Sequence, residues 1–548
     1  MPRVVEEANK ARPAGFLSGG PSASWSRSQR AAWLGAAAVL MAACVPGRLW
    51  PGLMWVAVAP LFVGLRGLRP LSAGGWAGVY GWWTWGSSTW WLHAPLREIL
   101  GLPMGTAIAL TLAGGLLLAL PYALAGAVAA WWPRRSGWVG ATREAAIFTL
   151  ALYWLAPVFD GNYAHTQYRF PAVFQVVELG GTPLLLFLIL WVNSLLAEGF
   201  LAWRQARARP WAPVVVAAVI LAGVLAYGTL RLRQFDAAMA AAPPEQWFTV
   251  GAIQPNLPLP LPPERAPAPA ALTNDFFTAL AQGRELARQH PEVEALAFPE
   301  NPATFVFNTD MARRQALGQL IRQTGKPVLL NVDAVDPAPA VADVPARYNV
   351  AAWLDADRNL AGSYAKIKRL PLVEYLPGEA AFPWLRHWFP RSLRVQAGEG
   401  PAVFELRPGI RVIPLICYEG TLSAFPRRFV RLGGNFIINQ VNDSWFLRTP
   451  ASEVHLAVTR YRTVEYRVPL VRVTNSGIGA HIQADGRIVP GSRTPLFAEA
   501  ATAFPLYVPP QRSVYTWLGD FWMLGFLPLF LPRFPRRRGK SSTASSDS

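Results

Sequence analysis

Seven apolar stretches follow one another through the first half of the chain, and this succession limits the possible folds more than any other feature. They cover about residues 31–46, 49–68, 71–92, 102–132, 144–160, 182–203 and 211–230, and an eighth, 514–531, comes near the end. Most are close to the roughly 20 residues that a helix needs to cross a bilayer. The fourth is longer, and we expect it to be tilted or broken near Pro121. The pattern predicts a multi-span α-helical membrane bundle.

The composition agrees with a membrane protein that also has a sizeable water-facing part. Of the 548 residues, 52% are hydrophobic and only 15% are charged, which is less charge than soluble domains usually carry. The formal net charge is +18, but much of it lies in short arginine clusters beside the apolar stretches. Such clusters set the orientation of membrane proteins. We therefore favour an orientation signal and attraction to anionic lipid, and expect no nucleic-acid partner.

The arginines fall on alternate connections between the stretches and beside both chain ends. They are Arg27, Arg30, Arg66, Arg69, Arg134, Arg135, Arg143, Arg204, Arg207, Arg209 and the terminal RRRGK. Because positive charge marks the cytoplasmic side, eight spans leave the long segment before the last one outside, in the periplasm of a cell with two membranes. The predicted organisation is a disordered cytoplasmic tail (1–30), a bundle (31–232), an outer domain (244–508), a final transmembrane helix (513–532) and a basic cytoplasmic tail (533–548).

The outer segment, 244–508, has a different pattern, in which short strand-like runs are separated by turns and polar helical stretches. Runs such as FTVGAIQ, PVLLNVDAV and GNFIINQV have the continuous apolar character of buried strands, and a helix is expected around 274–290. This mixture predicts a layered α/β domain.

Three reactive side chains come at or near the ends of such runs. Glu300 ends LAFPE, Lys366 lies in GSYAKIKRL and Cys417 follows RVIPLI. Together they are a complete set for acyl transfer, since a carboxylate can take the proton of a thiol nucleophile and an ammonium can stabilise an oxyanion. Taken singly, each is more often structural: a buried cysteine, a turn glutamate or a solvated lysine.

The sequence predicts neither a metal site nor a cofactor. Its two cysteines, Cys44 and Cys417, lie in different parts of the chain and imply no disulfide framework. The six histidines lack metal-ligand spacing, and no phosphate-binding P-loop is present in the sequence.

The order Glu, Lys, Cys within FPEN, YAK and ICYE resembles the nitrilase superfamily. Further motifs are GAIQPNLP at the domain start, NDSWF (442–446) and TRYRTVEYRVPLVRVTNSG (459–477), and apolar stretches lie on both sides of the domain. In these features the chain is similar to the membrane-embedded branch of that superfamily, the apolipoprotein N-acyltransferases. The resemblance implies an αββα sandwich attached to a membrane bundle.

The resemblance also implies roles for individual residues. Glu300 is the expected general base, Lys366 the oxyanion stabiliser and Cys417 the nucleophile. The expected supporting or substrate-binding residues are Glu374, Tyr418, Glu419, Trp445 and Asn475, of which Asn475 either lines the cleft or forms a strand-end turn.

The implied reaction moves an acyl chain from a phospholipid to the N-terminal amine of a diacylglyceryl-cysteine apolipoprotein, through a cysteine thioester. The implied location is the periplasmic face of the bacterial inner membrane, and we expect a monomer. Two other functions remain open: a membrane-tethered nitrilase-type amidase, in which water attacks the thioester, and a non-catalytic scaffold that binds lipid or protein.

Two parts of the sequence leave alternatives. The family usually reads close to LVPFGE after its lysine, whereas this chain reads RLPLVE with extra basic residues, so Lys368 competes with Lys366 as the catalytic lysine. The aromatic and basic insert at 379–395 is either a lid that touches lipid or a loop packed on the domain. In addition, Arg462 and Glu465 lie three apart on one expected helix, and we predict a structural ion pair between them.

Overall fold

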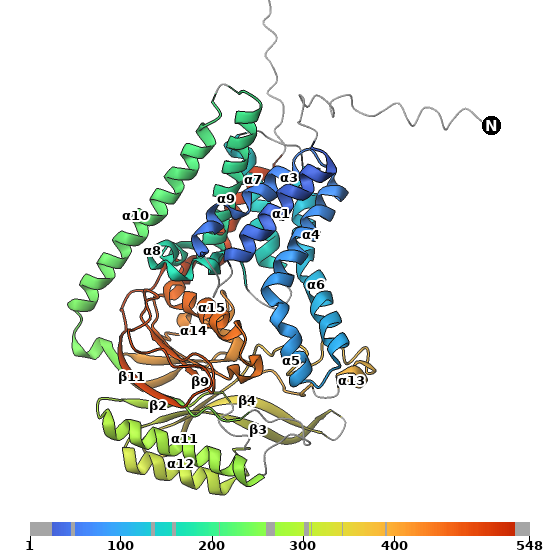
Figure 1. Cartoon of the computed structure of the whole chain (residues 1–548). Helices are drawn as coiled ribbons and strands as arrows, with labels where there is room; N and C mark the ends of the chain where they lie inside the picture. Colours follow the sequence, from blue (N-terminus) through green and yellow to red (C-terminus); the bar gives the residue numbers. More distant parts are fainter. Residues whose placement is uncertain are drawn as a thin grey trace, which may run out of the picture.

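The structure is a computed structural model in which a helical bundle sits on one side of a two-sheet sandwich (Figure 1). It describes residues 25–44, 50–132, 137–155, 161–207, 209–258, 269–300, 306–307, 309–341, 344–389 and 392–531. Several parts of the predictions lie outside these residues: nearly all of the tail at 1–30, the tail at 533–548, and Arg134 and Arg135. The first helix begins at Arg27, within the predicted tail, because Ser26 and Gln29 cap it reciprocally: each accepts a hydrogen bond from the other's backbone N–H, at 3.2 and 3.0 Å.

The bundle is built from helices whose bounds are α1 (Arg27–Cys44), α4 (Pro70–Thr89), α6 (Met104–Trp131), α7 (Trp138–Trp154), α9 (Val177–Arg204) and α10 (Ala212–Ala240). Among the described residues, α6, α9 and α10 are long and apolar enough to cross a membrane. The break considered near Pro121 is absent, because α6 continues through this proline. Helix α4 packs so closely on α6 that a Cβ on Gly126 would lie 2.6 Å from that of Ala77, a small-residue contact typical of membrane helices.

The second apolar stretch, predicted as one span, is divided into η1 (Pro51–Leu53), α2 (Met54–Ala57) and α3 (Ala59–Leu65). The side chain of Asn193 in α9 satisfies the interrupted backbone. Its Oδ1 accepts hydrogen bonds from the N–H groups of Val58 and Ala59, both at 2.8 Å, and its Nδ2 donates to the carbonyl of Met54 at 2.9 Å. A helix break inside a bundle is tolerated when neighbouring groups pair the freed backbone in this way.

The last apolar stretch also differs from its prediction. In place of one transmembrane helix at 513–532, the chain forms α16 (Val514–Leu518), the 3-10 segment η7 (Gly519–Phe526) and α17 (Leu527–Phe530). Gly519 has φ of +55°, which ends α16. Asp520 then accepts hydrogen bonds from the hydroxyls of Tyr153 and Tyr515, so this segment is bound to the bundle by polar contacts.

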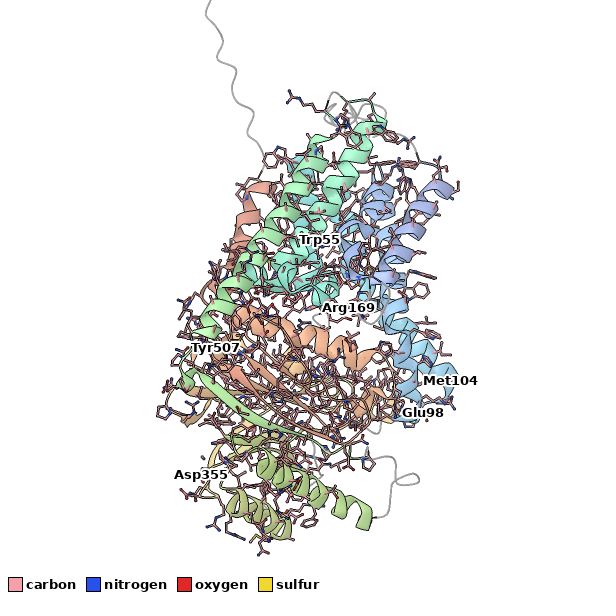
Figure 2. All side chains as sticks on the ribbon, turned by 60° about the vertical axis from the view of Figure 1, so that its left-hand side comes forward. Trp55, Glu98, Met104, Arg169, Asp355 and Tyr507 are labelled. Carbon is pink, nitrogen blue, oxygen red and sulfur yellow. The ribbon has the colours of Figure 1, made fainter. Side chains whose placement is uncertain are left out.

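Between these elements are shorter ones: η2 (Trp90–Leu92) and α5 (His93–Glu98) after α4, and η3 (Tyr163–Arg169) and α8 (Pro171–Phe174) before α9. Helices α4 and α6 and the turn between them form a hairpin that reaches beyond the rest of the bundle, beside the sandwich (Figure 1). Figure 2 shows Glu98 and Met104 at the tip of this hairpin, and Arg169 between the bundle and the sandwich.

The sandwich consists of two sheets. The first has the strand order β11-β1-β2-β3-β4-β5, and the second has the order β10-β9-β8-β7-β6. Their bounds are β1 (Trp247–Gln254), β2 (Ala295–Ala297), β3 (Val328–Val341), β4 (Val344–Leu354), β5 (Leu360–Ala365), β6 (Phe404–Arg407), β7 (Ile410–Ile416), β8 (Phe436–Val441), β9 (Leu470–Thr474), β10 (Ala480–Ile482) and β11 (Ala500–Tyr507).

Helices cover both outer faces of the sandwich. The first sheet is covered by α11 (Pro269–Gln289) and α12 (Met311–Thr324), and the second faces the bundle across α14 (Arg427–Arg431) and α15 (Ala451–Tyr466) (Figure 1). One buried core, which includes Phe248 and Ile437, lies between the sheets, and another, which includes Leu320, lies under the outer helices. The predicted αββα sandwich on a helical bundle is confirmed.

Helix α15 joins the sandwich to the bundle through a buried ion pair. Arg462 and Glu465 are 2.9 Å apart and have no exposed side-chain surface, which confirms the predicted pair. Thr182 of α9 donates its backbone N–H to Glu465 at 2.7 Å and accepts from Arg462 at 3.0 Å. Ser423, six residues after Cys417, donates to the same carboxylate at 2.6 Å. The position of the sandwich relative to α9 is thereby fixed.

Candidate active site

The three predicted reactive residues come from strand ends in both sheets. Glu300 lies three residues after β2, Lys366 directly follows β5, and Cys417 directly follows β7. Because the two sheets pack face to face, their strand ends can bring these side chains to one place. The structure does so: Lys366 Nζ is 3.2 Å from Glu300 Oε1, and Cys417 is close enough to both residues for their charges to act on its thiol.

Lys366 is almost fully buried, with 1% of its side chain exposed, between two carboxylates. Its Nζ is 2.9 Å from Glu374 Oε1 as well as 3.2 Å from Glu300. Burial alone lowers the pKa of a lysine, but the charges of Glu300 and Glu374 outweigh it and hold the pKa of Lys366 well above its usual value. The two carboxylates therefore favour the ammonium form of Lys366, which is suited to stabilise an oxyanion. Lys368 is exposed and is not part of this cluster.

Cys417 stands on a strained turn. Its φ is +54°, a left-handed conformation that costs free energy for a residue with a Cβ. Asn439 supports this turn by donating to the carbonyl of Cys417 at 3.1 Å. Burial raises the pKa of the Cys417 thiol, the negative charge of Glu300 raises it further, and Lys366 opposes both effects. The sulfur therefore rests as a thiol and needs a base before it can act as a nucleophile.

Glu419 connects the turn of Cys417 to the segment that follows Lys366. It is fully buried and accepts four hydrogen bonds, from the Tyr364 hydroxyl at 2.8 Å and from the backbone N–H groups of Ile367 (2.9 Å), Lys368 (2.9 Å) and Ile416 (3.0 Å). Burial raises the pKa of Glu419 to about 7, although the donated hydrogen bonds oppose this shift. The side chain therefore fixes the turn of Cys417 relative to the segment that follows Lys366.

The other predicted residues lie around this cluster in different ways. The hydroxyl of Tyr418 donates to the carbonyl of Arg369 at 3.2 Å, on the lysine side of the site. Trp445 is half-buried in η6 (Asp443–Phe446), and the neighbouring ring of Phe446 contacts Trp91 of the bundle hairpin, with centroids 5.7 Å apart. Trp445 therefore lies where the sandwich meets the membrane part.

Asn475 is bonded to a loop and not to the reactive cluster. Its Oδ1 accepts from the backbone N–H of Leu257 at 2.8 Å, and its Nδ2 donates to the carbonyl of the same residue at 2.9 Å. These bonds hold the loop at Leu257 to the end of β9, and a substrate-binding role for Asn475 stays a prediction.

Several buried polar residues at the site escaped the sequence analysis. Asn349 of β4 donates to Glu300 Oε1 at 2.9 Å and is itself oriented by Asn331 of β3 at 2.7 Å. Close to the backbone of Cys417, His455 Nδ1 is 2.9 Å from Asp443, which also pairs with Arg472 at 2.7 Å. The only signal for the two asparagines was an amide inside an otherwise apolar strand, where a buried polar group needs a partner.

Comparisons with known proteins match both parts of the chain. Residues 274–500 match the family model described as carbon-nitrogen hydrolase, and residues 36–195 match the model of the apolipoprotein N-acyltransferase N-terminal domain.

The chain is similar to curated proteins along most of its length. It is 28% identical over 502 residues to the apolipoprotein N-acyltransferase of Geobacter metallireducens, covering 88% of this chain and 90% of that protein. It is 27% identical over 472 residues to the protein of the same name from Rhizobium meliloti, covering 84% of each. Among solved structures, it is similar to Nit3 of Saccharomyces cerevisiae, a nitrilase-superfamily member, with a TM-score of 0.37 and 14% identity over 54% of this chain and 97% of that one. Along most of its length the chain is therefore similar to apolipoprotein N-acyltransferases, and it joins a part that matches their N-terminal domain to a part that matches carbon-nitrogen hydrolases.

Proposed function

We propose that this protein moves an acyl chain from a phospholipid to the N-terminal amine of a diacylglyceryl-cysteine apolipoprotein, with Cys417 as the carrier. Its relatives bear the name apolipoprotein N-acyltransferase. The observation that carries the proposal is the meeting of Glu300, Lys366 and Cys417 at one place on a sandwich that is packed against a membrane bundle.

In the first half-reaction, Glu300 takes the proton of the Cys417 thiol, and the sulfur attacks an ester carbonyl of the phospholipid. The ammonium of Lys366 stabilises the oxyanion that develops on the carbonyl oxygen. When this intermediate collapses, the bond to the glycerol oxygen breaks, and that oxygen takes the proton from Glu300. A lysophospholipid leaves, and the acyl chain remains on Cys417 as a thioester.

In the second half-reaction, the neutral α-amine of the apolipoprotein attacks the thioester carbonyl, and Lys366 again stabilises the oxyanion. Glu300 takes a proton from the amine and returns it to the sulfur as the carbon–sulfur bond breaks. An amide forms, and the free thiol is regenerated. Glu374 and Glu419 act as positioning residues, the first by sharing Lys366 with Glu300 and the second by holding the turn of Cys417.

The bundle gives this reaction access to substrates that are anchored in the bilayer. Removing an acyl chain from lipid costs about 0.8 kcal/mol per CH₂, and a site beside the membrane avoids most of this cost. The arginine pattern of the sequence supports a catalytic domain on the periplasmic side of the bacterial inner membrane. One chain supplies every group that the mechanism uses, so we propose that it acts as a monomer.

The test uses the purified full-length protein with a phospholipid labelled in its acyl chains and a diacylated lipopeptide. We expect the label to appear as an amide on the lipopeptide, and none to appear with Cys417→Ala. Release of labelled free fatty acid in place of the amide would identify a hydrolase. Unchanged transfer by Cys417→Ala would exclude Cys417 as the carrier and contradict the proposal.

A further inference from the structure

Lys368 is a charged residue at the active site that the mechanism does not use. Its side chain is exposed, and among the described residues no carboxylate pairs with it. Its backbone is nevertheless held in place, because its N–H donates to Glu419 at 2.9 Å. Lys366, two residues earlier, lies against Glu300. The chain thus places an exposed ammonium outside the buried cluster, on a residue whose backbone is held by the carboxylate two residues after Cys417.

The segment that begins here has more positive than negative charge. From residue 366 to residue 396, the charged residues other than histidine are Lys366, Lys368, Arg369, Arg386, Arg391, Arg394, Glu374 and Glu379. Both carboxylates are already engaged: Glu374 binds Lys366, and Glu379 pairs with Arg386 at 2.6 Å and with Arg394 at 3.1 Å. The charge of Lys368 is therefore not neutralised within the described part of this segment.

The same segment exposes large aromatic side chains. Phe382, Trp384 and Trp388 are 53%, 61% and 64% exposed, the last within the short helix α13 (Leu385–Trp388). Figure 1 shows α13 at the level of α5, at the tip of the α4–α6 hairpin. Further along that hairpin, α6 exposes a row of leucines, which are Leu112, Leu116, Leu117, Leu120 and Leu124. Tryptophan beside arginine at the end of an apolar span is typical of the membrane–water interface, where basic residues attract anionic head groups.

We propose that Lys368 binds the anionic phosphate head group of the phospholipid acyl donor, so that anionic phospholipids are better donors than zwitterionic ones. This inference rests on the proposed function. In a glycerophospholipid, only the glycerol separates the phosphate from the reacting ester, so a head group at Lys368 lies close to an ester at Cys417. A zwitterionic head group carries its own ammonium next to the phosphate and gains less from the lysine. The contact is the same in the ground and transition states, so it acts on KM and not on kcat.

The experiment measures acyl-adduct formation on Cys417 in the full-length protein, with either phosphatidylglycerol or phosphatidylethanolamine as donor. For Lys368→Gln we expect KM for phosphatidylglycerol to rise about three- to five-fold, the size of one lysine contact at a lipid surface. We expect a smaller change for phosphatidylethanolamine and an unchanged kcat. Lys368→Arg keeps the charge and should restore the KM. The matched control is Arg284→Gln, which removes an exposed charge from α11, on the side of the sandwich away from the bundle.

The outcomes separate this inference from the proposed function. If the wild-type protein forms no adduct with either lipid, both fail. If it forms the adduct but Lys368→Gln changes neither KM, or changes both equally, only the role of Lys368 is overturned. Glycerol 3-phosphate, which carries the phosphate without acyl chains, should inhibit only far above the lipid concentrations used. Competition at concentrations comparable to the lipid would mean that the site recognises soluble phosphate, and would also overturn the inference.

Discussion

Replacing Glu419 by glutamine tests whether one buried carboxylate holds the nucleophile and the lysine segment together. Glu419 accepts four hydrogen bonds and donates none, three of them at Oε1 and one, from Ile416, at Oε2. A glutamine has one oxygen and one NH₂ group. Whichever way it is oriented, the NH₂ group faces at least one buried N–H donor, and that donor loses its acceptor.

An unpaired buried donor costs about 1–3 kcal/mol, and the charge that strengthens the other three bonds is also lost. For Glu419→Gln we therefore expect a free energy of unfolding that is lower by about 2–4 kcal/mol. This figure combines the cost of at least one unpaired donor with the weakening of the remaining hydrogen bonds. Because the change acts where β7 ends at Cys417, we expect acylation of Cys417 to slow by at least about ten-fold, the equivalent of 1.4 kcal/mol.

Thermal unfolding in detergent reports the stability, and single-turnover acylation followed by intact-protein mass spectrometry reports the rate. The matched control is Glu405→Gln, the same substitution at a carboxylate that is 56% exposed and whose ion-pair partner among the described residues, Arg411, is 3.8 Å away. The control should change neither quantity measurably. If Glu419→Gln unfolds at the wild-type temperature and acylates Cys417 at the wild-type rate, Glu419 does not position the site.

Three further predictions follow from buried polar groups. Acylation should rise with pH through about 7, because burial raises the pKa of Glu419 to about 7 and only its carboxylate accepts all four bonds. Because the pKa of Glu419 is higher in the folded than in the unfolded protein, Glu419 contributes fully to stability at acid pH, and this contribution is lost as the pH rises to about 7. The free energy of unfolding should therefore fall over the pH range in which the acylation rate rises. An acylation rate that does not change between pH 6 and 8 would contradict this. Asn349→Leu removes the donor to Glu300, and we expect kcat to fall about ten-fold with little change in KM. If lipid binding weakened as much as kcat fell, Asn349 would act in binding lipid and not in orienting Glu300. Asn193→Leu leaves the backbone N–H groups of Val58 and Ala59 unpaired and should lower the unfolding temperature in detergent without changing the rate per folded molecule.

The sequence singled out Glu300, Lys366 and Cys417 because each comes at or near the end of an apolar run and the resemblance assigns each a role, and the structure places Lys366 against Glu300. An apolar run that stops at polar residues shows where a strand ends along the chain. It does not show which other strands lie beside it in the sheet. The sequence favoured Lys366 over Lys368 by its resemblance alone, because the contact that distinguishes the two lysines is not local. It depends on Glu374, which folds back from eight residues away to share the ammonium of Lys366.

The parts that the sequence did not predict depend on contacts between distant residues. The break at 51–65 needs Asn193, more than 130 residues later in the chain, to pair the freed backbone. Hydropathy registers the apolar character of such a stretch but not its interruption. The same holds for 513–532, where Gly519 and the tyrosine contacts of Asp520 replace one long helix by three short ones. Asn349 is oriented by Asn331 only because of the register in which β3 and β4 pair. The sequence of each strand by itself does not define this register.

The most direct test of the mechanism is the mass of the intact protein after exposure to phospholipid without an acceptor. We predict an increase equal to one acyl chain, located on the peptide that contains Cys417, removed by hydroxylamine and absent from Cys417→Ala. An increase of the same size on another residue, or an unchanged mass in a preparation that transfers acyl chains to a lipopeptide, would contradict a thioester on Cys417.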